Sequence, residues 1–280
     1  MRQKRRWSKV IWLVLGGVIG LYLGGCFVMA KGYVSPVRLS AGERLPGVLE
    51  VAFETDEYEI PAWRAGEGDD VFLLVHGYGG RQSYWNELAT ELMPHGEVVV
   101  IATMGQTVSP VGEVGFGDGE AGEIITVAKA LREEGKRVHV VGVSMGGAAA
   151  WLAAGREPEL FTSVTTEAAF ARLDWGSDDF LSVSVPGGAR LFRPIVLLAE
   201  RKKGVNGAEI RPADAAKKFG GPALILHSRG DGMFGARHAE ALAEAAGVEV
   251  TWFEGWKHAE IFQNEAERVA VMIREVGGVE

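Results

Sequence analysis

One serine of the chain stands in a turn suited to nucleophilic chemistry. Ser144 lies in the sequence GVSMGG (residues 142–147), between an apolar segment and a segment rich in alanine. Small residues on both sides permit a sharp turn from a strand into a helix, which lifts the hydroxyl above the edge of a sheet. The N–H groups that begin such a helix are unpaired and favour a negative charge nearby. We therefore predict that Ser144 is a nucleophile.

A serine hydroxyl needs a base to take its proton, and the base needs a third group to orient it. His258 ends the sequence GWKH (255–258), just past the last predicted strand, where a loop can carry the imidazole over the sheet edge. Asp231 ends the sequence HSRGD (227–231), directly after another apolar strand. We predict a triad of Ser144 as nucleophile, His258 as base and Asp231 as the acid that orients it.

The other histidines have structural interpretations. His139 lies inside the predicted strand that leads to the serine, and His95 and His238 are predicted to be surface residues at helix ends. His76 begins the glycine-rich sequence HGYGG (76–80), where we expect it to hold a loop by hydrogen bonding.

That glycine-rich loop is the predicted source of an oxyanion hole. The backbone N–H groups of Tyr78 and Met145 are the candidate donors to the substrate's carbonyl oxygen. Each such donor contributes roughly 2.7–4 kcal/mol to stabilising the transition state.

Alternating strand and helix patterns are predicted to position these residues. Apolar runs predict strands over 48–53, 58–64, 71–75, 98–102, 138–143, 163–168, 223–227 and 248–253. Helical spacing predicts helices over 83–93, 120–134, 145–154, 236–246 and 265–276. This alternation predicts an α/β fold, with a mostly parallel sheet of about eight strands flanked by helices.

Residues 171–211 interrupt the alternation and are predicted to form a small cap over the sheet, with a helix over 191–202. Its apolar side chains are predicted to line a substrate pocket: Phe180, Leu181, Val183, Val185, Leu191 and Phe192. Trp175, with Asp174, Asp178 and Asp179, is interpreted as a solvated acidic loop. An alternative hypothesis is that this cluster binds a substrate amine.

The N-terminus predicts a membrane anchor. Residues 10–30 are uncharged and long enough to cross a bilayer as a helix, and five basic residues precede them. This charge bias predicts that the N-terminus stays in the cytoplasm and that the catalytic domain lies outside it at the cell membrane. We thus expect a basic stub and anchor over 1–34 and a catalytic domain over 35–280. A cleaved signal is the alternative.

A second alternative is a lipoprotein. Cys26, the sole cysteine, ends the sequence LGGC (23–26), which resembles a bacterial lipobox, although apolar residues continue after it. A single cysteine also excludes an intrachain disulfide and a zinc site built on several thiolates. The formal net charge of −8 disfavours a general nucleic-acid partner, because phosphates are repelled.

Together the motifs HG (76–77), GVSMGG (142–147), HSRGD (227–231) and GWKH (255–258) resemble those of the α/β-hydrolase superfamily, over residues 48–278. Within it the chain is similar to bacterial membrane-anchored or secreted hydrolases of the serine aminopeptidase and prolyl-oligopeptidase-like groups. The resemblance implies the triad and oxyanion hole named above, and neither a metal nor an organic cofactor. Many relatives carry a charged D-x-R-G-x-G-x-S turn where residues 102–109 of this chain read ATMGQTVS. Because that loop helps to shape the substrate pocket, the substrate class of those relatives cannot be inferred for this chain.

These observations predict a serine hydrolase that forms an acyl-enzyme. Our first choice is a carboxylesterase acting on small-molecule esters or thioesters. An aminopeptidase-like amide hydrolase is the alternative. A membrane-tethered binding protein that keeps the fold without the chemistry is the remaining hypothesis.

Overall fold

The computed structural model of the chain describes residues 2–184 and 188–280. Within these residues an eight-stranded sheet has the order β1-β2-β4-β3-β5-β6-β7-β8. Strands β4, β3, β5, β6, β7 and β8 are parallel, whereas β1 and β2 form an antiparallel edge. The predicted, mostly parallel sheet is confirmed. The strand bounds are Leu49–Glu54 (β1), Glu59–Ala65 (β2), Asp70–Val75 (β3), Glu97–Ile101 (β4), Arg137–Val143 (β5), Phe161–Glu167 (β6), Ala223–Ser228 (β7) and Val250–Phe253 (β8).

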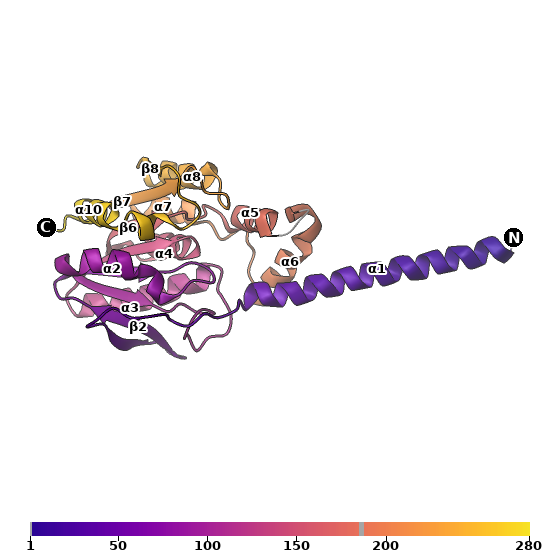
Figure 1. Cartoon of the computed structure of the whole chain (residues 1–280), viewed down its shortest axis with the longest axis horizontal. Helices are drawn as coiled ribbons and strands as arrows, with labels where there is room; N and C mark the ends of the chain where they lie inside the picture. Colours follow the sequence, from indigo (N-terminus) through magenta and orange to yellow (C-terminus); the bar gives the residue numbers. More distant parts are fainter. Residues whose placement is uncertain (1, 185–187) are drawn as a thin grey trace.

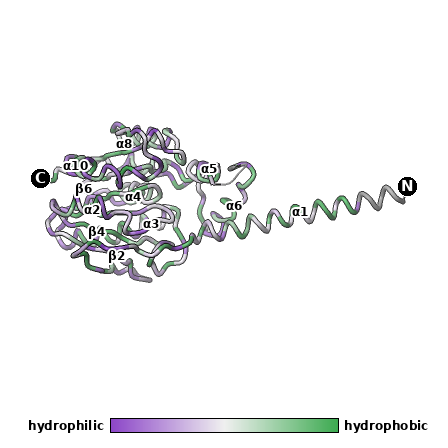
Figure 2. Tube along the Cα trace, viewed as in Figure 1, coloured by the Kyte–Doolittle hydropathy of each residue, from purple (hydrophilic) through white to green (hydrophobic). Residues whose placement is uncertain are grey.

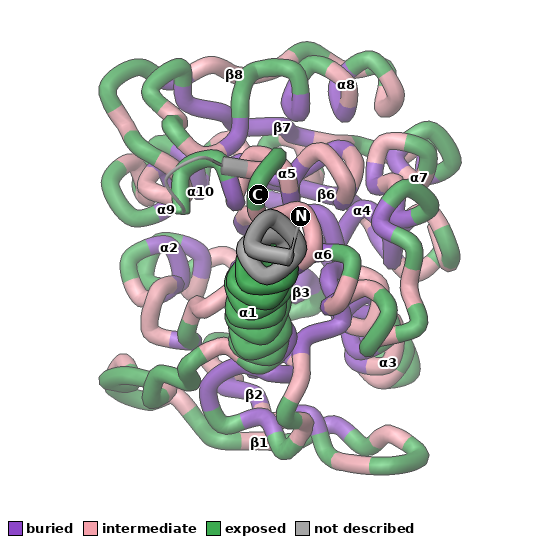
Figure 3. Tube along the Cα trace, turned by 90° about the vertical axis from the view of Figure 1, so that its right-hand side faces the viewer, coloured by how far each residue is buried: buried purple, intermediate pink, exposed green. Residues whose placement is uncertain are grey.

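Helices cover both faces of the sheet (Figure 3). Helices α2, α9 and α10 lie on one face, and α3, α4, α7 and α8 lie on the other. Strand β3 reads as a continuous apolar run because Leu73 and Val75 pack on one face while Phe72 and Leu74 pack on the other. The bounds of these helices are Asn86–Leu92 (α2), Asp118–Glu133 (α3), Met145–Arg156 (α4), Pro212–Phe219 (α7), Ala236–Ala246 (α8), Ile261–Asn264 (α9) and Ala266–Gly277 (α10).

Two predicted helices differ in their details. The helix predicted over 83–93 is a 3₁₀ turn, Gln82–Trp85 (η1), followed by α2 and a second 3₁₀ turn, Met93–His95 (η2). Pro94 in that second turn has no N–H to continue the α-helical hydrogen bonds, which explains the early end of α2. The helix predicted over 265–276 is α10, preceded by the short α9. A third 3₁₀ turn, Pro158–Leu160 (η3), leads into β6.

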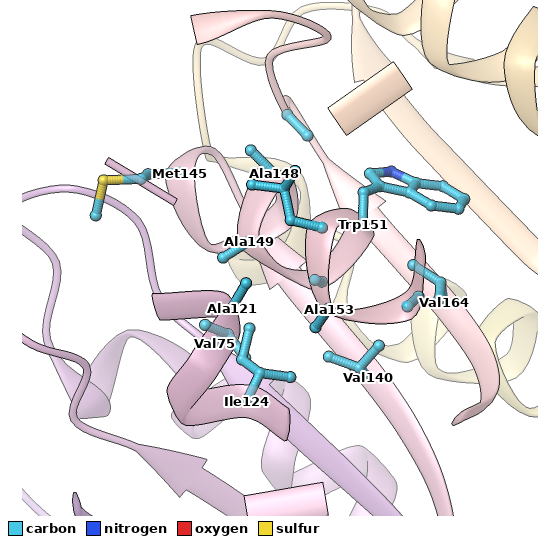
Figure 4. Packing of buried hydrophobic residues seen from close by; sticks show 14 of the residues in the cluster. Val75, Ala121, Ile124, Val140, Met145, Ala148, Ala149, Trp151, Ala153 and Val164 are labelled. Atoms are coloured by element: carbon cyan, nitrogen blue, oxygen red, sulfur yellow. The ribbon is translucent and has the colours of Figure 1, made fainter. Parts of the chain in front are cut away.

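Helix α4 follows the candidate nucleophile and lies in the core of the molecule (Figure 4). Its alanines, with Trp151, are almost fully buried and pack among Val75, Ile124 and Val140. Small side chains let the neighbouring helices α3 and α7 approach α4 closely. The serine turn is thus attached to a helix whose first ten residues are all buried.

The cap consists of two helices, Leu173–Ser184 (α5) and Gly188–Lys203 (α6). The helix predicted over 191–202 lies within α6. Figure 1 shows α5 and α6 at the end of the body from which helix α1 projects.

Helix α1 (Arg2–Val34) contains the one stretch of the described chain that is long and apolar enough to cross a membrane, Lys9–Val34. Most of it extends beyond the body, and Figure 2 shows hydrophobic residues along this projecting part. Three residues at four-residue spacing, Cys26, Ala30 and Val34, are buried. They form one stripe of the helix, along which α1 packs against α6.

Candidate active site

Ser144 occupies the turn between β5 and α4 with a strained backbone. Its φ of 54° and ψ of −119° lie outside the regions that a non-glycine residue ordinarily adopts. Its N–H donates to the backbone oxygen of Glu167 at 2.9 Å, which ties the turn to the end of β6. This conformation places the side chain outside both the strand and the helix.

The glycines on either side of Ser144 are required by close packing of the backbone. A Cβ at Gly146 would lie 2.3 Å from the oxygen of Val75, and one at Gly142 would lie 2.5 Å from the oxygen of Gly146. Neither contact can be relieved by moving a flexible side chain, because the atoms belong to the backbone. The GVSMGG pattern is therefore a steric requirement of this turn.

The structure brings Ser144, His258 and Asp231 together in one relay. The Ser144 Oγ lies 2.9 Å from Nε2 of His258, and Nδ1 of His258 lies 2.9 Å from Oδ2 of Asp231. His258 comes from the loop after β8, and Asp231 comes from the loop after β7. Phe234 packs edge-on against the His258 ring, with centroids 4.9 Å apart, and covers one of its sides.

Asp231 is held as a carboxylate. Its side chain is 1% exposed, and this burial alone would raise its pKa. The hydrogen bond and electrostatic interaction with His258, together with the N–H groups of Met233 and Phe234 donating to Oδ1, outweigh burial and lower the pKa below its ordinary value. A charged Asp231 fixes Nδ1 of His258 as the protonated nitrogen, so Nε2 faces Ser144 as the acceptor.

The two predicted oxyanion donors lie beside Ser144. Met145 begins α4, and both Tyr78 and Met145 line the pocket that holds the Ser144 hydroxyl. Within the described residues, neither backbone N–H has a hydrogen-bond partner in the protein, so both are available to a ligand. The loop that carries Tyr78 is held by Gln106, whose Oε1 accepts from the N–H of Gly79 at 2.9 Å.

His76 holds the same loop from inside the protein. Its Nδ1 lies 3.1 Å from the oxygen of Gly77, and burial lowers its pKa to about 4. The neutral ring thus donates to that carbonyl, in agreement with its predicted structural role. The ring of His139, also buried, bonds to Asp70 and Ser163 inside the fold.

A pocket of about 110 Å³ opens at Ser144 and His258. Its walls are mostly aromatic and aliphatic. They come from the cap, the glycine-rich loop 76–80 (the oxyanion loop), the loop before α3, the start of α4, the loops after β6 and β7, and the end of α1. The lining residues other than the candidate catalytic pair are Tyr33, Tyr78, Phe116, Met145, Phe170, Leu173, Gly176, Ser177, Phe180, Met233 and Phe234.

The predicted pocket lining is largely wrong. Phe180 does line the pocket, but the other described members of the predicted set lie elsewhere. They are buried in the cap, packed against α1 or exposed to solvent: Leu181, Val183, Leu191 and Phe192. Val185 lies outside the described residues. The predicted set followed the apolar residues of the segment, whereas α5 presents Leu173, Gly176, Ser177 and Phe180 to the pocket, at helical spacing.

Sequence reasoning also missed several walls and one support of the site. Phe116 and Phe234 lie in loops without a periodic pattern, and Tyr33 resembles an ordinary aromatic residue at a membrane boundary. Gln106 is in the neutral loop that replaces the charged turn, and its single hydrogen bond to the oxyanion loop leaves no sequence signal.

The acidic residues of the cap do not form a solvated loop. They lie in helix α5, and each is paired with its own arginine: Asp174 with Arg172, Asp178 with Arg193 and Asp179 with Arg237. Two of these arginines, Arg172 and Arg237, also lie over the Trp175 ring. Each carboxylate thus already faces an arginine, and none of the three lines the pocket at Ser144. Among the described residues, no group of three or more His, Cys, Asp or Glu side chains is placed to hold a metal ion.

The prediction that His238 lies on the surface is also wrong. His238 is fully buried, its Nδ1 accepts from the N–H of Ala171 at 3.1 Å, and its Nε2 lies 3.0 Å from Oδ2 of Asp179. Burial lowers its pKa, so the neutral ring joins α8 to the cap. Helical position alone could not show that α5 covers this residue.

Comparison with known proteins identifies the fold. The sequence model described as "Alpha/beta hydrolase family" matches residues 72–271. An esterase of Pyrococcus furiosus has a TM-score of 0.68 and 18% identity, covering 87% of this chain and 95% of its own. A bacterial membrane phospholipase A has a TM-score of 0.62 and 19% identity, covering 99% and 98%. A putative lipase of Acinetobacter baumannii has a TM-score of 0.64 and 18% identity, covering 83% and 93%. At these identities the solved structures show a shared fold. No curated protein matches the chain.

Proposed function

We propose that this chain, which belongs to the alpha/beta hydrolase family, is a serine carboxylesterase anchored in a membrane. The observation that carries the proposal is the relay at 2.9 Å from Ser144 to His258 and at 2.9 Å from His258 to Asp231. A half-buried histidine placed between a strained serine and a charged aspartate is the arrangement that activates a hydroxyl for acyl transfer.

The reaction proceeds through an acyl-enzyme. Nε2 of His258 takes the proton as Ser144 Oγ attacks the substrate carbonyl, and the resulting oxyanion accepts hydrogen bonds from the N–H groups of Tyr78 and Met145. The bond to the leaving oxygen then breaks, and that oxygen receives the proton from His258. Water, activated by the same imidazole, hydrolyses the acyl-Ser144 ester and releases the acid.

The pocket favours an acyl group over an aminoacyl group. Its walls are apolar, and none of the described lining residues is a carboxylate that could pair with a substrate amine. The arginine pairing of Asp174, Asp178 and Asp179 removes the observation that had favoured an aminopeptidase. Thioesters fit the same geometry, and their leaving atom is sulfur where that of an ester is oxygen.

The membrane arrangement follows from α1. Its projecting apolar part crosses the bilayer, with the basic N-terminus in the cytoplasm and the catalytic domain outside. The lipoprotein alternative has less support, because Cys26 is 2% exposed and is packed within α1 as part of the core.

Labelling with a fluorophosphonate probe tests the proposed nucleophile. We expect the native protein to be labelled and Ser144→Ala to be unlabelled, because the probe reacts with an activated serine hydroxyl. Ser40→Ala, which changes an exposed serine in the segment before β1, is the matched control and should be labelled normally. Equal labelling of Ser144→Ala would refute the assignment.

The substrate class is tested on the same protein. p-Nitrophenyl acyl esters should be cleaved with a much higher kcat/KM than the corresponding aminoacyl p-nitroanilides. A preference for the amides would instead indicate a peptidase, and absence of both turnover and labelling would indicate a binding protein that keeps only the fold.

A further inference from the structure

The membrane helix itself supplies a wall of the candidate active site. Tyr33, one residue before the end of α1, lines the pocket together with Ser144 and His258. Its ring stacks on Phe180 of the cap with centroids 5.6 Å apart, and it lies 5.2 Å from the ring of Phe116. The Tyr33 hydroxyl lies 3.2 Å from Oγ of Ser177. The anchor is therefore part of the site, and not only a tether to it.

The end of α1 is also bonded to the oxyanion loop. The hydroxyl of Tyr78, whose backbone N–H is a proposed oxyanion donor, donates to the backbone oxygen of Tyr33 at 3.0 Å. The backbone oxygen of Val34 accepts from the N–H of Val114 at 2.9 Å. These bonds fix the distance between the catalytic serine and the point at which the chain leaves the membrane.

That distance is short. Tyr33 lies three residues beyond Ala30, the last residue of the uncharged stretch, which is about 4.5 Å along a helix. The polar layer on each side of a bilayer's hydrocarbon core is roughly 5–7 Å thick. The distance along α1 from the end of the uncharged stretch to the pocket wall is therefore no greater than the thickness of one such layer.

The cap has the composition of a helix that lies at such an interface. Helix α6 runs beside the last turns of α1, with the Phe192 ring against Tyr22, and Figures 1 and 3 show the two helices side by side. Leu197 is 51% exposed and shares one helix face with Arg190 and Arg201, both exposed. Exposed leucine between arginines matches a bilayer surface with anionic headgroups.

We propose that the substrate is an acyl ester lipid drawn from the bilayer in which the chain is anchored. This inference rests on the proposed esterase function and adds the substrate class and its source. Ser144 would take the acyl group as the ester bond to the lipid's alcohol portion breaks, and His258 would pass the proton taken from Ser144 to the leaving oxygen, which departs as the alcohol. Water then releases a fatty acid, while the deacylated lipid remains at the membrane.

The test uses the full chain reconstituted in vesicles of phosphatidylcholine and phosphatidylglycerol. Fatty acid released from these lipids is compared with hydrolysis of water-soluble p-nitrophenyl butyrate by the same preparation. The variant Leu197→Glu places a charge on the cap surface, outside the pocket. Leu49→Glu places the same charge on an exposed leucine at the start of β1, away from the cap, and is the matched control.

We expect the wild-type chain to release fatty acid from vesicles. Leu197→Glu should lower this rate at least about tenfold, the factor expected when one leucine side chain loses its apolar contact. Both variants should hydrolyse the soluble ester normally, and Leu49→Glu should also act normally on vesicles.

A wild-type chain that cleaves the soluble ester but releases no fatty acid from vesicles would overturn the lipid proposal and leave the esterase function intact. An unchanged vesicle rate in Leu197→Glu would overturn the role of the cap surface. Loss of soluble-ester hydrolysis together with loss of probe labelling would instead mark failure of the esterase function itself.

Discussion

Ser144 combines backbone strain with contacts that hold the strain in place. The φ of Ser144 is 54°, and holding a non-glycine residue in such a conformation costs about 1–3 kcal/mol of folding free energy. The conformation persists only where the surrounding contacts leave the residue no alternative. Here the close approach of Gly146 to the backbone of Val75 and the bond from the Ser144 N–H to Glu167 do so. The serine is thereby positioned before any substrate arrives.

Asp231→Asn is predicted to reduce kcat by about 10³–10⁴-fold. The amide would lose the negative charge that stabilises a protonated His258 and would favour the wrong tautomer of its ring. The measurement is esterase kinetics on a soluble ester, with thermal unfolding as a control for folding. A folded variant with a kcat within threefold of wild type would show that Asp231 is not the orienting acid.

The three residues of the relay could be predicted from sequence because each of them follows a strand with a strong local pattern. The pocket could not, because its walls depend on how distant segments meet. Tyr33, Phe116 and Phe234 are separated by long stretches of chain and share no periodicity. The roles of Tyr78 and Met145 as oxyanion donors stay a prediction from the sequence.

At the level of elements, the alternating pattern predicted the sheet well and the cap poorly. Buried parallel strands such as β3 and β5 are continuous apolar runs, so their positions are visible in the sequence. Helix α5 instead carries Asp174, Asp178 and Asp179, which resemble a solvated loop until their arginine partners are known. Two of those partners lie on other helices, and local reasoning does not reach them.

Glu167 joins three elements beneath the candidate site. Its buried carboxylate, at the end of β6, accepts from the N–H groups of Ile261 and Phe262 in α9 and from the hydroxyl of Tyr84. Burial raises its pKa from 4.5 to about 7, against the opposing effects of these hydrogen bonds and of His258. The folded protein therefore holds a proton on Glu167 over a pH range in which the unfolded chain has lost it.

This shift predicts a pH-dependent stability with a definite sign. The contribution of Glu167 is fully present below about pH 4.5 and is lost as the pH rises to about 7. At about 1.4 kcal/mol for each pH unit, the loss is about 3 kcal/mol. Glu167→Gln cannot ionise at this position, so its free energy of unfolding should lack this pH-dependent part. Denaturant unfolding of both proteins at pH 5 and pH 8 measures the difference. If the free energy of unfolding changes equally with pH in the two proteins, the assignment to Glu167 is contradicted.

At the level of the whole molecule, helix α1 and the α/β body share their packing. The sequence predicts a boundary after residue 34, four residues past the end of the uncharged stretch. Helix α1 does end there, yet Cys26, Ala30 and Val34 are buried against the body and Tyr33 lines its pocket. A hydropathy pattern marks the length of a span but cannot show which of its residues pack on protein, because both environments favour apolar side chains.

This shared packing predicts that the position of a truncation decides whether the catalytic body keeps its activity. A chain beginning at Leu21 retains the buried stripe of α1 and Tyr33, whereas a chain beginning at Ser35 loses them. In the chain from Ser35, the rings of Phe116 and Phe180 have lost Tyr33, against which they pack. This loss should lower the free energy of unfolding by about 3 kcal/mol or more. For a domain of this size, that loss lowers Tm by about 6–12 °C.

With both chains in the same mild detergent, thermal unfolding measures the difference, and kinetics on a soluble ester report on the pocket. The chain from Ser35 should show a raised KM, because one wall of the pocket is absent, and a lowered kcat, because Tyr78 has lost its hydrogen bond to the backbone of Tyr33. The chain from Leu21 should match the full-length protein in both constants. If the two chains share the same Tm and the same kinetics, then α1 serves only as a tether, and the pocket is complete without it.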